Sequence, residues 1–171
     1  MQTIKTTADK GKVSEVVQKA TIAKKASARL VSLATEQKND ALLKMADRLV
    51  SRTGDIIAAN QLDLQRGEEN GLSRSLLDRL ALNAERIEGI AEGLRQIAQL
   101  PDPIGEQLET IERPNGLRIE KVRVPIGLIG MIYEARPNVT VDASGLCLKT
   151  GNAVLLRGGS SALESNRQIV N

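Results

Sequence analysis

The stretch IGLIGMIYEARPNVTVDASGLCLKTGNAVLLRGGSS (residues 126–161) places a helical pattern between two short apolar runs. Residues 126–133 are continuous and apolar, which is typical of a parallel strand buried on both faces. Residues 139–151 predict a helix that ends at Gly151, and residues 152–157 predict a second buried strand. Strand, helix and strand in this order predict a βαβ unit. We therefore expect an α/β fold with a Rossmann-like parallel sheet, incomplete because the sequence stops inside the next helix.

A polar turn follows each predicted strand. The first turn is EARPN (residues 134–138) and the second is RGGSS (residues 157–161). The carboxyl ends of parallel strands meet at one edge of a sheet, where open α/β sheets bind their ligands. Both turns also precede a helix N-terminus, where free backbone N–H groups and the helix dipole favour anions. We therefore expect the two turns to lie together and to bind a ligand.

The chemistry of the second turn suits a phosphate group. Two glycines permit a close backbone approach, two serines offer hydroxyl groups, and an arginine offers a permanently charged fork: Arg157, Gly158, Gly159, Ser160 and Ser161. The alternative is a glycine turn in which Ser160 only caps the helix, and the spacing leaves both interpretations open. After the second strand of a dinucleotide fold, an acid binds the ribose of NAD, whereas an arginine accommodates the 2′-phosphate of NADP. Since no acid precedes Glu164, a dinucleotide at this turn would be NADP.

The first hundred residues show helical periodicity, which predicts an N-terminal helical part over residues 1–104. We expect Gly54 to break the second helix from the third, which begins after Asp55, and residues 68–73 to form a loop. Asn83 is expected to cap the last helix, which ends at Pro101. The predicted helices are residues 13–31, 40–53, 56–67, 73–82 and 84–100.

Residues 105–124 change to a strand pattern around the turn Pro114-Asn115-Gly116, in which Asn and Gly accept positive φ. Apolar and charged residues alternate in the second run, which predicts a half-exposed antiparallel hairpin. Because a two-stranded hairpin is marginally stable alone, it can be either a surface hairpin or an oligomerisation arm. The remaining part, residues 125–171, is the predicted first βαβ unit of a cofactor domain.

The composition excludes several kinds of site. With no histidine and one cysteine, the sequence cannot hold a Ser-His-Asp triad, a Cys-His pair or a His-based zinc site. We expect no metal site. Cys147, between two leucines of a predicted helix, is expected to be a small buried hydrophobe and not a reactive thiolate. A single cysteine is typical of a reducing compartment.

Charge and hydropathy narrow the partners. The net charge is +3, but acidic and basic residues are interspersed and aromatic residues make up 1%, so we expect no nucleic-acid partner. No run approaches the roughly 18 apolar residues of a membrane span. Residues 1–12 lack the apolar region of a secretory signal. These features predict a soluble, cytoplasmic protein without a membrane partner.

Residues 124–166 closely resemble the matching segment of the gamma-glutamyl phosphate reductases, also called glutamate-5-semialdehyde dehydrogenases. The stretches YEARPNVT and LKTGNAVLLRGG carry the resemblance most specifically, and it extends back through LDLQRGEENGLS and LLDRLAL. More distantly, the segment is similar to part of the aldehyde dehydrogenase superfamily. The resemblance therefore covers nearly the whole sequence.

This resemblance implies an aldehyde-dehydrogenase-like fold and the NADPH-dependent reduction of gamma-glutamyl phosphate to glutamate 5-semialdehyde and phosphate, a step of proline biosynthesis. In the family's mechanism a cysteine thiolate displaces phosphate to form a thioester, and hydride from the nicotinamide then releases the aldehyde. The resemblance also implies a homo-oligomer assembled through the hairpin arm. The pathway suggests an association with glutamate 5-kinase.

Site residues carry over only where they match. The RGGSS turn matches the turn that holds the adenosine ribose in aldehyde dehydrogenases, and Ser160 stands where many NAD-using relatives have a glutamate. Asn138 resembles the asparagine whose side-chain amide stabilises the oxyanion on the substrate carbonyl, although Arg136-Pro137-Asn138 replaces the usual Pro-Trp-Asn. Cys147 does not match the motif of the nucleophilic cysteine, which the resemblance places beyond Asn171.

The sequence is therefore expected to be the N-terminal part of a longer reductase and to be inactive by itself. Two alternatives stay open. One is a non-catalytic binding or assembly module derived from that enzyme. The other is a related aldehyde dehydrogenase that acts on another substrate.

Overall fold

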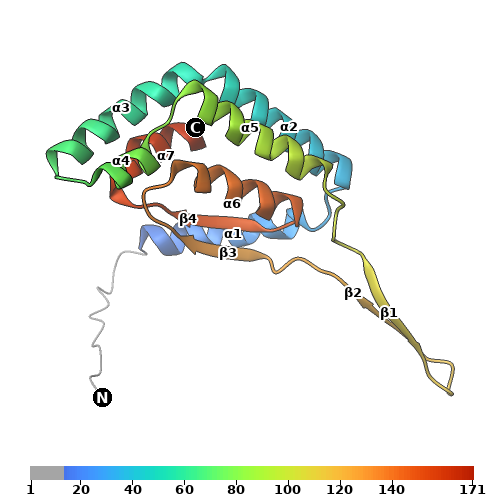
Figure 1. Ribbon diagram of the computed structural model, residues 1–171. Coiled ribbons are helices and arrows are strands. Elements are labelled where there is room, and N and C mark those ends of the chain that lie inside the picture. The colour runs from blue at the N-terminus through green and yellow to red at the C-terminus, as the bar shows by residue number, and fades with distance from the viewer. Residues whose placement is uncertain (1–13) are drawn as a thin grey trace, which may run out of the picture.

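The structure is a computed structural model that describes residues 14–171 (Figure 1). Val13 and residues 1–12, on which part of the first predicted helix and the absence of a signal sequence were argued, lie outside the described residues. The elements in chain order are α1 (Glu15–Leu30), α2 (Thr35–Ser51), α3 (Thr53–Glu69), α4 (Arg74–Leu80), α5 (Ala84–Gln99), β1 (Gln107–Glu112), β2 (Arg118–Val122), β3 (Leu128–Ile132), α6 (Pro137–Lys149), β4 (Ala153–Arg157), the 3-10 turn η1 (Ser160–Ala162) and α7 (Leu163–Val170).

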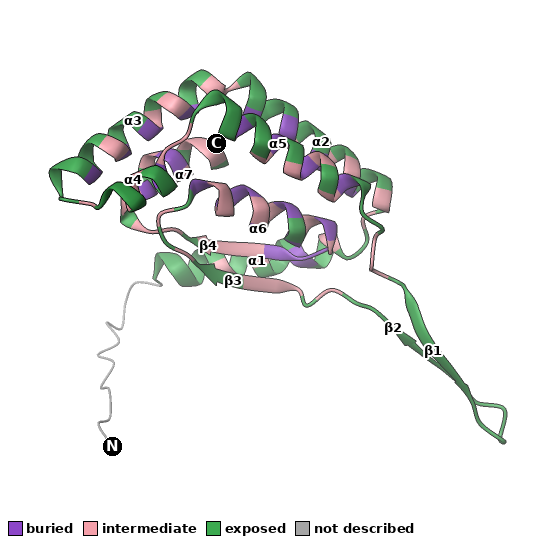
Figure 2. Ribbon diagram, in the orientation of Figure 1, coloured by how far each residue is buried: buried purple, intermediate pink, exposed green. Residues whose placement is uncertain are grey.

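The hydrophobic core lies where α2 and α5 pack against each other and against α6 (Figure 2). Aliphatic side chains and alanines fill it, as the composition predicted, and burial of each large one stabilises the fold by about 1.5–3 kcal/mol. The buried members are Leu42, Ala46, Leu49, Ile56, Ile87, Ala91, Leu94, Ala98 and Val141. Because Val141 belongs to α6, the N-terminal helices and the βαβ unit share one core.

The junction between α2 and α3 corrects a predicted boundary. The break falls at Arg52 and not at Gly54, which lies within the first turn of α3. The Thr53 hydroxyl donates to the Val50 carbonyl (2.8 Å), which supplies the last turn of α2 with a side-chain donor. A glycine in the first turn costs little, because the first amide groups of a helix have no intrahelical partner.

Three other helix ends differ from the prediction. Helix α2 begins at Thr35 and not at residue 40, because the Gln37 side chain accepts a hydrogen bond from the Ala34 amide (2.9 Å) and caps the helix. Helix α3 continues to Glu69, and its end is closed by the Leu72 amide donating to the Gly67 carbonyl (2.9 Å). Helix α6 begins at Pro137, since proline is favoured at the first helical position.

The predicted βαβ unit is present. Strands β3 and β4 pair in parallel with Leu128 opposite Ala153 and Ile132 opposite Arg157. The crossover helix α6 packs between β4 and the helices α2 and α5, and Gly151 ends it with a φ of 67°. In the described part of the chain these two strands form a sheet of their own.

Burial of the sheet differs from the prediction. Residues 126–133 were expected to be buried on both faces, but Ile126 is 79% exposed and Ile132 is 83% exposed. The reason is that β3 pairs with β4 on one edge alone, and no other described strand pairs with it.

Helix α1 packs against β4 and β3, but not through the predicted face. Ala20, Ala23, Ser27 and Leu30 form the covered stripe, at spacings of three and four. Val16 (60%) and Val17 (53%) are exposed, so the predicted apolar stripe is wrong for these two residues.

The hairpin of β1 and β2 projects away from the other elements (Figure 1). Its strands are antiparallel as predicted, with Ile111 opposite Ile119, and Gly116 in the turn has a φ of 82°. Every residue of both strands is exposed, whereas the alternation predicted a half-exposed hairpin. No described element covers either face.

Candidate functional site

The two predicted turns meet at one edge of the sheet. The Tyr133 amide donates to the Arg157 carbonyl (3.1 Å), which extends the pairing of β3 with β4 into the turns. A Cβ built on Gly159 would lie 3.4 Å from the carbonyl carbon of Glu134, so the backbones of the two turns are in contact. The predicted juxtaposition of EARPN and RGGSS is therefore confirmed.

The RGGSS turn presents free polar groups to solvent. The Arg157 guanidinium is exposed and has no hydrogen bond or ion pair with any residue of 14–171. The Ser160 and Ser161 hydroxyls likewise have no partner among the described side chains. This donor set, one permanent cation and two hydroxyls, can receive a phosphorylated ribose.

Gly158 is enclosed from below. A Cβ at this position would overlap the amide nitrogen of Asn166 and lie 3.1 Å from the Tyr133 hydroxyl oxygen. The Tyr133 hydroxyl is 2.6 Å from the Thr140 hydroxyl, which in turn donates to the Asn166 Oδ1 (2.8 Å). These three polar side chains form a chain of hydrogen bonds under the turn. The sequence did not reveal them, because they come from three elements.

Helix α7, which follows the turn, is capped by a distant carboxylate. Asp63 of α3 accepts hydrogen bonds from the Glu164 amide (3.2 Å), the Ser165 amide (2.8 Å) and the Ser165 hydroxyl (2.8 Å). Two amides at this helix N-terminus, expected to be free for an anion, are therefore occupied. The groups left to bind a ligand at the turn are the side chains of Arg157, Ser160 and Ser161.

A second buried polar side chain of α3 supports the same helix. The Asn60 amide donates to the Leu80 carbonyl (2.9 Å) and the Ser165 hydroxyl (3.0 Å), and its oxygen accepts from the Leu82 amide (2.8 Å). In sequence, Asn60 and Asp63 look like ordinary polar residues of an amphipathic helix. No local signal distinguishes them, since their partners lie about 20 and 100 residues away along the chain.

Asn138 lies in the first turn of α6 and is half-buried. Its Nδ2 donates to the Asp142 Oδ2 (3.0 Å). Because a carboxylate only accepts hydrogen bonds, this contact fixes which end of the amide is the donor. The second Nδ2 hydrogen can then donate to a carbonyl oxygen of a substrate.

A hollow of about 390 Å³ lies beside Asn138, between α4, α5 and α6. Its lining combines charged groups with small apolar ones: Asp78, Arg79, Ala81, Leu82, Arg86, Gly89, Ile90, Arg136, Asn138 and Asp142. No residue of the RGGSS turn lines it. The two predicted sites thus share one end of the sheet but open into different spaces.

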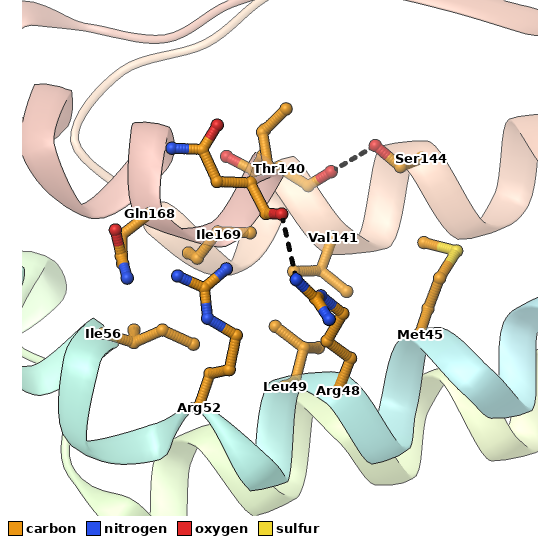
Figure 3. A pocket seen from close by; sticks show the side chains of 12 residues that line it. Met45, Arg48, Leu49, Arg52, Ile56, Thr140, Val141, Ser144, Gln168 and Ile169 are labelled. Atoms are coloured by element: carbon orange, nitrogen blue, oxygen red, sulfur yellow. Dashed lines mark hydrogen bonds between the residues drawn. The ribbon is translucent and has the colours of Figure 1, made fainter.

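Another hollow of about 350 Å³ lies between α2, α3, α6 and α7 (Figure 3). Apolar side chains such as Met45, Leu49 and Ile169 form its wall, and the Arg48 guanidinium donates to the Asn171 carbonyl (3.4 Å) across it. None of the predicted site residues lines this space, so the chemistry assigned above does not take place in it.

Cys147 is buried, 7% exposed, as expected for a small hydrophobe, and burial raises the pKa of its thiol. Residues 14–171 contain no group of three cysteine, aspartate or glutamate side chains placed to hold a metal ion. Among the described helices, none has the length and apolar character needed to span a bilayer.

Comparison with known proteins gives strong sequence matches. The chain is 56% identical over 158 residues to a gamma-glutamyl phosphate reductase of Anoxybacillus flavithermus, covering 92% of this chain and 38% of that protein. It is 60% identical over 153 residues to the gamma-glutamyl phosphate reductase of Halothermothrix orenii, covering 90% and 37%. The chain therefore spans about 38% of the length of the curated relatives that it matches. No family model matches it.

Solved structures agree on the fold. The crystal structure of gamma-glutamyl phosphate reductase from Thermotoga maritima has a TM-score of 0.90 and 46% identity, over 92% of this chain and 38% of that chain. A NAD-dependent benzaldehyde dehydrogenase from Corynebacterium glutamicum has a TM-score of 0.67 at 20% identity, over 91% and 32%. PnpE, solved with nicotinamide adenine dinucleotide, has a TM-score of 0.65 at 22% identity, over 88% and 28%. The fold is aldehyde-dehydrogenase-like α/β.

Proposed function

Because the chain belongs to the gamma-glutamyl phosphate reductase family over the residues it shares with these relatives, we propose that the complete enzyme carrying it reduces gamma-glutamyl phosphate with NADPH. The products are glutamate 5-semialdehyde and phosphate. The identity of 56–60% over nine-tenths of the chain is the observation that carries this proposal. The thiolate that attacks the acyl phosphate belongs to a part of the enzyme outside residues 1–171.

The three parts of the chain have different tasks in this proposal. Residues 1–104 supply the helices that pack on the cofactor domain. Residues 105–124 form the oligomerisation arm of a homo-oligomer. Residues 125–171 supply the first βαβ unit, whose turns contact cofactor and substrate. Support for this division comes from the shared α2–α5–α6 core and from the fully exposed hairpin.

The RGGSS turn is proposed to hold the adenosine end of NADP. The unpaired Arg157 guanidinium binds the 2′-phosphate, and Ser160 and Ser161 donate hydroxyl hydrogen bonds beside it. Gly158 and Gly159 bring the backbone close to the ribose. When bound, NADPH supplies the hydride for the reduction. The side chains that fit it are those of a 2′-phosphate site, since no acidic residue lies within the turn.

Asn138 is proposed to stabilise the negative charge that develops on the substrate carbonyl oxygen. Its Nδ2 is oriented by Asp142, so the donor is in place before the reaction begins. Loss of one such donor typically costs about 2.7–4 kcal/mol of transition-state stabilisation. This role needs the carbonyl carbon to lie next to the hollow of α4, α5 and α6.

We place the enzyme in the cytoplasm, where glutamate 5-kinase would supply its substrate. An acyl phosphate hydrolyses readily in water, so association with that kinase would limit its loss.

The cofactor assignment is tested by Arg157→Ala in the complete enzyme. NADPH affinity should fall by about 1–3 kcal/mol, or about tenfold to a hundredfold, because a charged hydrogen bond is lost. NADH affinity should be almost unchanged. Fluorescence titration of both cofactors measures this, with Arg167→Ala of α7 as the matched control. Equal losses for the two cofactors would show that Arg157 does not bind the 2′-phosphate.

The reaction itself is tested by oxidation of glutamate 5-semialdehyde with NADP and phosphate. The complete enzyme should be active, the 171-residue chain should not, and Cys147→Ser in the complete enzyme should retain its rate. Absence of phosphate-dependent turnover in the complete enzyme would overturn the proposed function. Turnover by the short chain would overturn the assignment of the nucleophile.

A further inference from the structure

The hollow beside Asn138 holds more charged groups than an oxyanion site requires. Three arginines and two aspartates line it: Asp78, Arg79, Arg86, Arg136 and Asp142. If Asn138 stabilises the carbonyl oxygen of a bound substrate, the rest of that substrate extends into this space. The charges of the hollow then meet the part of the substrate away from the reacting carbon.

One of the arginines is not free to bind a ligand. Arg86 donates to the Asp78 carboxylate (2.8 Å) and to the Ala81 carbonyl (2.9 Å), and so ties α5 to the end of α4. This leaves the side chains of Arg79, Arg136 and Asp142. In the described chain neither arginine has a hydrogen bond or ion pair, and the Asp142 carboxylate receives the Asn138 amide alone.

Two unpaired guanidinium groups and one unpaired carboxylate match the charges of an α-amino acid. We propose that this hollow binds the amino-acid head of the substrate, an inference that rests on the proposed function. The Asp142 carboxylate accepts hydrogen bonds from the α-ammonium group. The guanidinium groups of Arg79 and Arg136 bind the α-carboxylate.

The dimensions of the substrate agree with this placement. Four bonds of roughly 1.5 Å separate the reacting carbon from the α-nitrogen, a span of about 5 Å when extended. Asn138 and Asp142 are one helical turn apart on α6, and four residues of helix rise about 6 Å. A carbonyl at Asn138 therefore brings the α-ammonium group to Asp142.

A simpler role for Asp142 is to orient Asn138 and nothing else. The two roles differ in what they depend on. Loss of orientation would lower kcat for every aldehyde by the same factor, because each one needs the oxyanion donor. Loss of an ammonium contact would raise KM only for substrates that carry an amino group.

The test uses three aldehydes with the complete enzyme, NADP and phosphate. They are glutamate 5-semialdehyde, 5-oxopentanoate, which lacks the amino group, and 4-aminobutanal, which lacks the carboxylate. Asp142→Asn should raise KM about tenfold or more for the two amino substrates and leave 5-oxopentanoate unchanged, since loss of one charged hydrogen bond has this size. Arg79→Gln and Arg136→Gln should raise KM for the two carboxylates and not for 4-aminobutanal.

Arg74→Gln is the matched control, because Arg74 lies on the same helix as Arg79, is exposed and does not line the hollow. Arg79 is itself exposed, so its variant tests the hollow without disturbing the core. A uniform change across the three aldehydes in all three hollow variants would overturn the proposal.

Binding of L-glutamate, measured by calorimetry on the same proteins, separates this proposal from the proposed function. Wild-type binding that Asp142→Asn weakens and Arg74→Gln retains supports the head-group site even where turnover is absent. Turnover by the wild type together with L-glutamate binding that is indifferent to Asp142→Asn, Arg79→Gln and Arg136→Gln overturns the site and leaves the reductase function standing.

Discussion

Asp63 connects two segments that lie a hundred residues apart. Its carboxylate is buried in α3 and receives three hydrogen bonds from the first turn of α7. A carboxylate at a helix N-terminus is favourable, because it pairs orphan amides and complements the helix dipole. Since α7 begins directly after the RGGSS turn and η1, Asp63 sets the position of the turn relative to the helical part.

We expect Asp63→Asn to lower the free energy of unfolding by about 1–3 kcal/mol, because an amide nitrogen cannot accept and leaves a buried donor unpaired. Urea denaturation measures this. Asp47→Asn is the control, since Asp47 is 78% exposed and should change stability by less than about 0.5 kcal/mol. Similar stabilities for the two variants would show that the Asp63 contacts contribute nothing net.

Gly145 determines how closely α6 approaches α5. A Cβ at this position would lie 2.6 Å from Leu94 Cδ2 and 3.2 Å from Ile97 Cδ1. The missing side chain therefore allows the two helices to pack directly. Leu94 belongs to the core cluster, so this contact joins the βαβ unit to the N-terminal helices.

Gly145→Ala is predicted to destabilise the fold by about 1–3 kcal/mol, because the added methyl overpacks a close helix contact. Gly93→Ala on α5 is the control: nothing lies within 4 Å of its Cβ position, and alanine should stabilise the helix by up to about 1 kcal/mol. Thermal unfolding compares them. An unchanged or raised melting temperature for Gly145→Ala would contradict this account of the interface.

Asp102 links α2 to the segment that leads into the hairpin. It receives hydrogen bonds from the Thr35 hydroxyl (2.8 Å) and the Ile104 amide (3.0 Å), and it pairs with the buried Lys38 ammonium. Burial alone would raise the pKa of this carboxyl. The hydrogen bonds from Lys38, Ile104 and Thr35 outweigh burial and hold the pKa below its usual value.

A carboxyl with a lowered pKa stabilises the folded chain above its ordinary pKa near 4, and this stabilisation is lost as pH falls below that value. We therefore expect the difference in unfolding free energy between wild type and Asp102→Asn to shrink from about pH 6 to about pH 3. Denaturation at several pH values measures it. Asp40→Asn, at an exposed pair, should show little such change, and a constant difference for Asp102→Asn would refute the linkage.

The hairpin is the part of the molecule that the rest of the described chain does not cover. Its apolar residues are exposed on both strands, including Leu108 (45%), Leu117 (53%) and Ile119 (41%). An exposed two-stranded hairpin with apolar side chains gains stability when another surface covers it. This property supports the proposed oligomerisation arm at the scale of the whole molecule.

Ile119→Lys in the complete enzyme is expected to reduce the oligomer to a smaller species, because a charge replaces an apolar contact at the proposed interface. Light scattering coupled to size exclusion measures the mass. Thr110→Lys is the control, since Thr110 pairs with Glu120 on the opposite face of the same hairpin. An oligomer that is unaffected by Ile119→Lys would remove the arm from the assembly.

Much of this fold could be predicted from local patterns. Apolar runs with a helical period between them determined the βαβ unit, and Asn83, whose side chain accepts from the Arg86 amide (2.7 Å), determined the start of α5. The pairing of EARPN with RGGSS followed as well, because parallel strands must end at the same edge. These features depend on residues close in sequence or on a rule of topology.

Only the tertiary structure decided which polar residues meet. Asp63 at α7, Asn166 under Gly158, and the free charges of Arg79, Arg136 and Asp142 in one hollow come from elements far apart in sequence. Burial of β3 was also decided there, since a strand's exposure depends on its neighbours and not on its own apolar content. Local chemistry sets which elements form, whereas packing over long separations sets which side chains face one another and which stay free to bind.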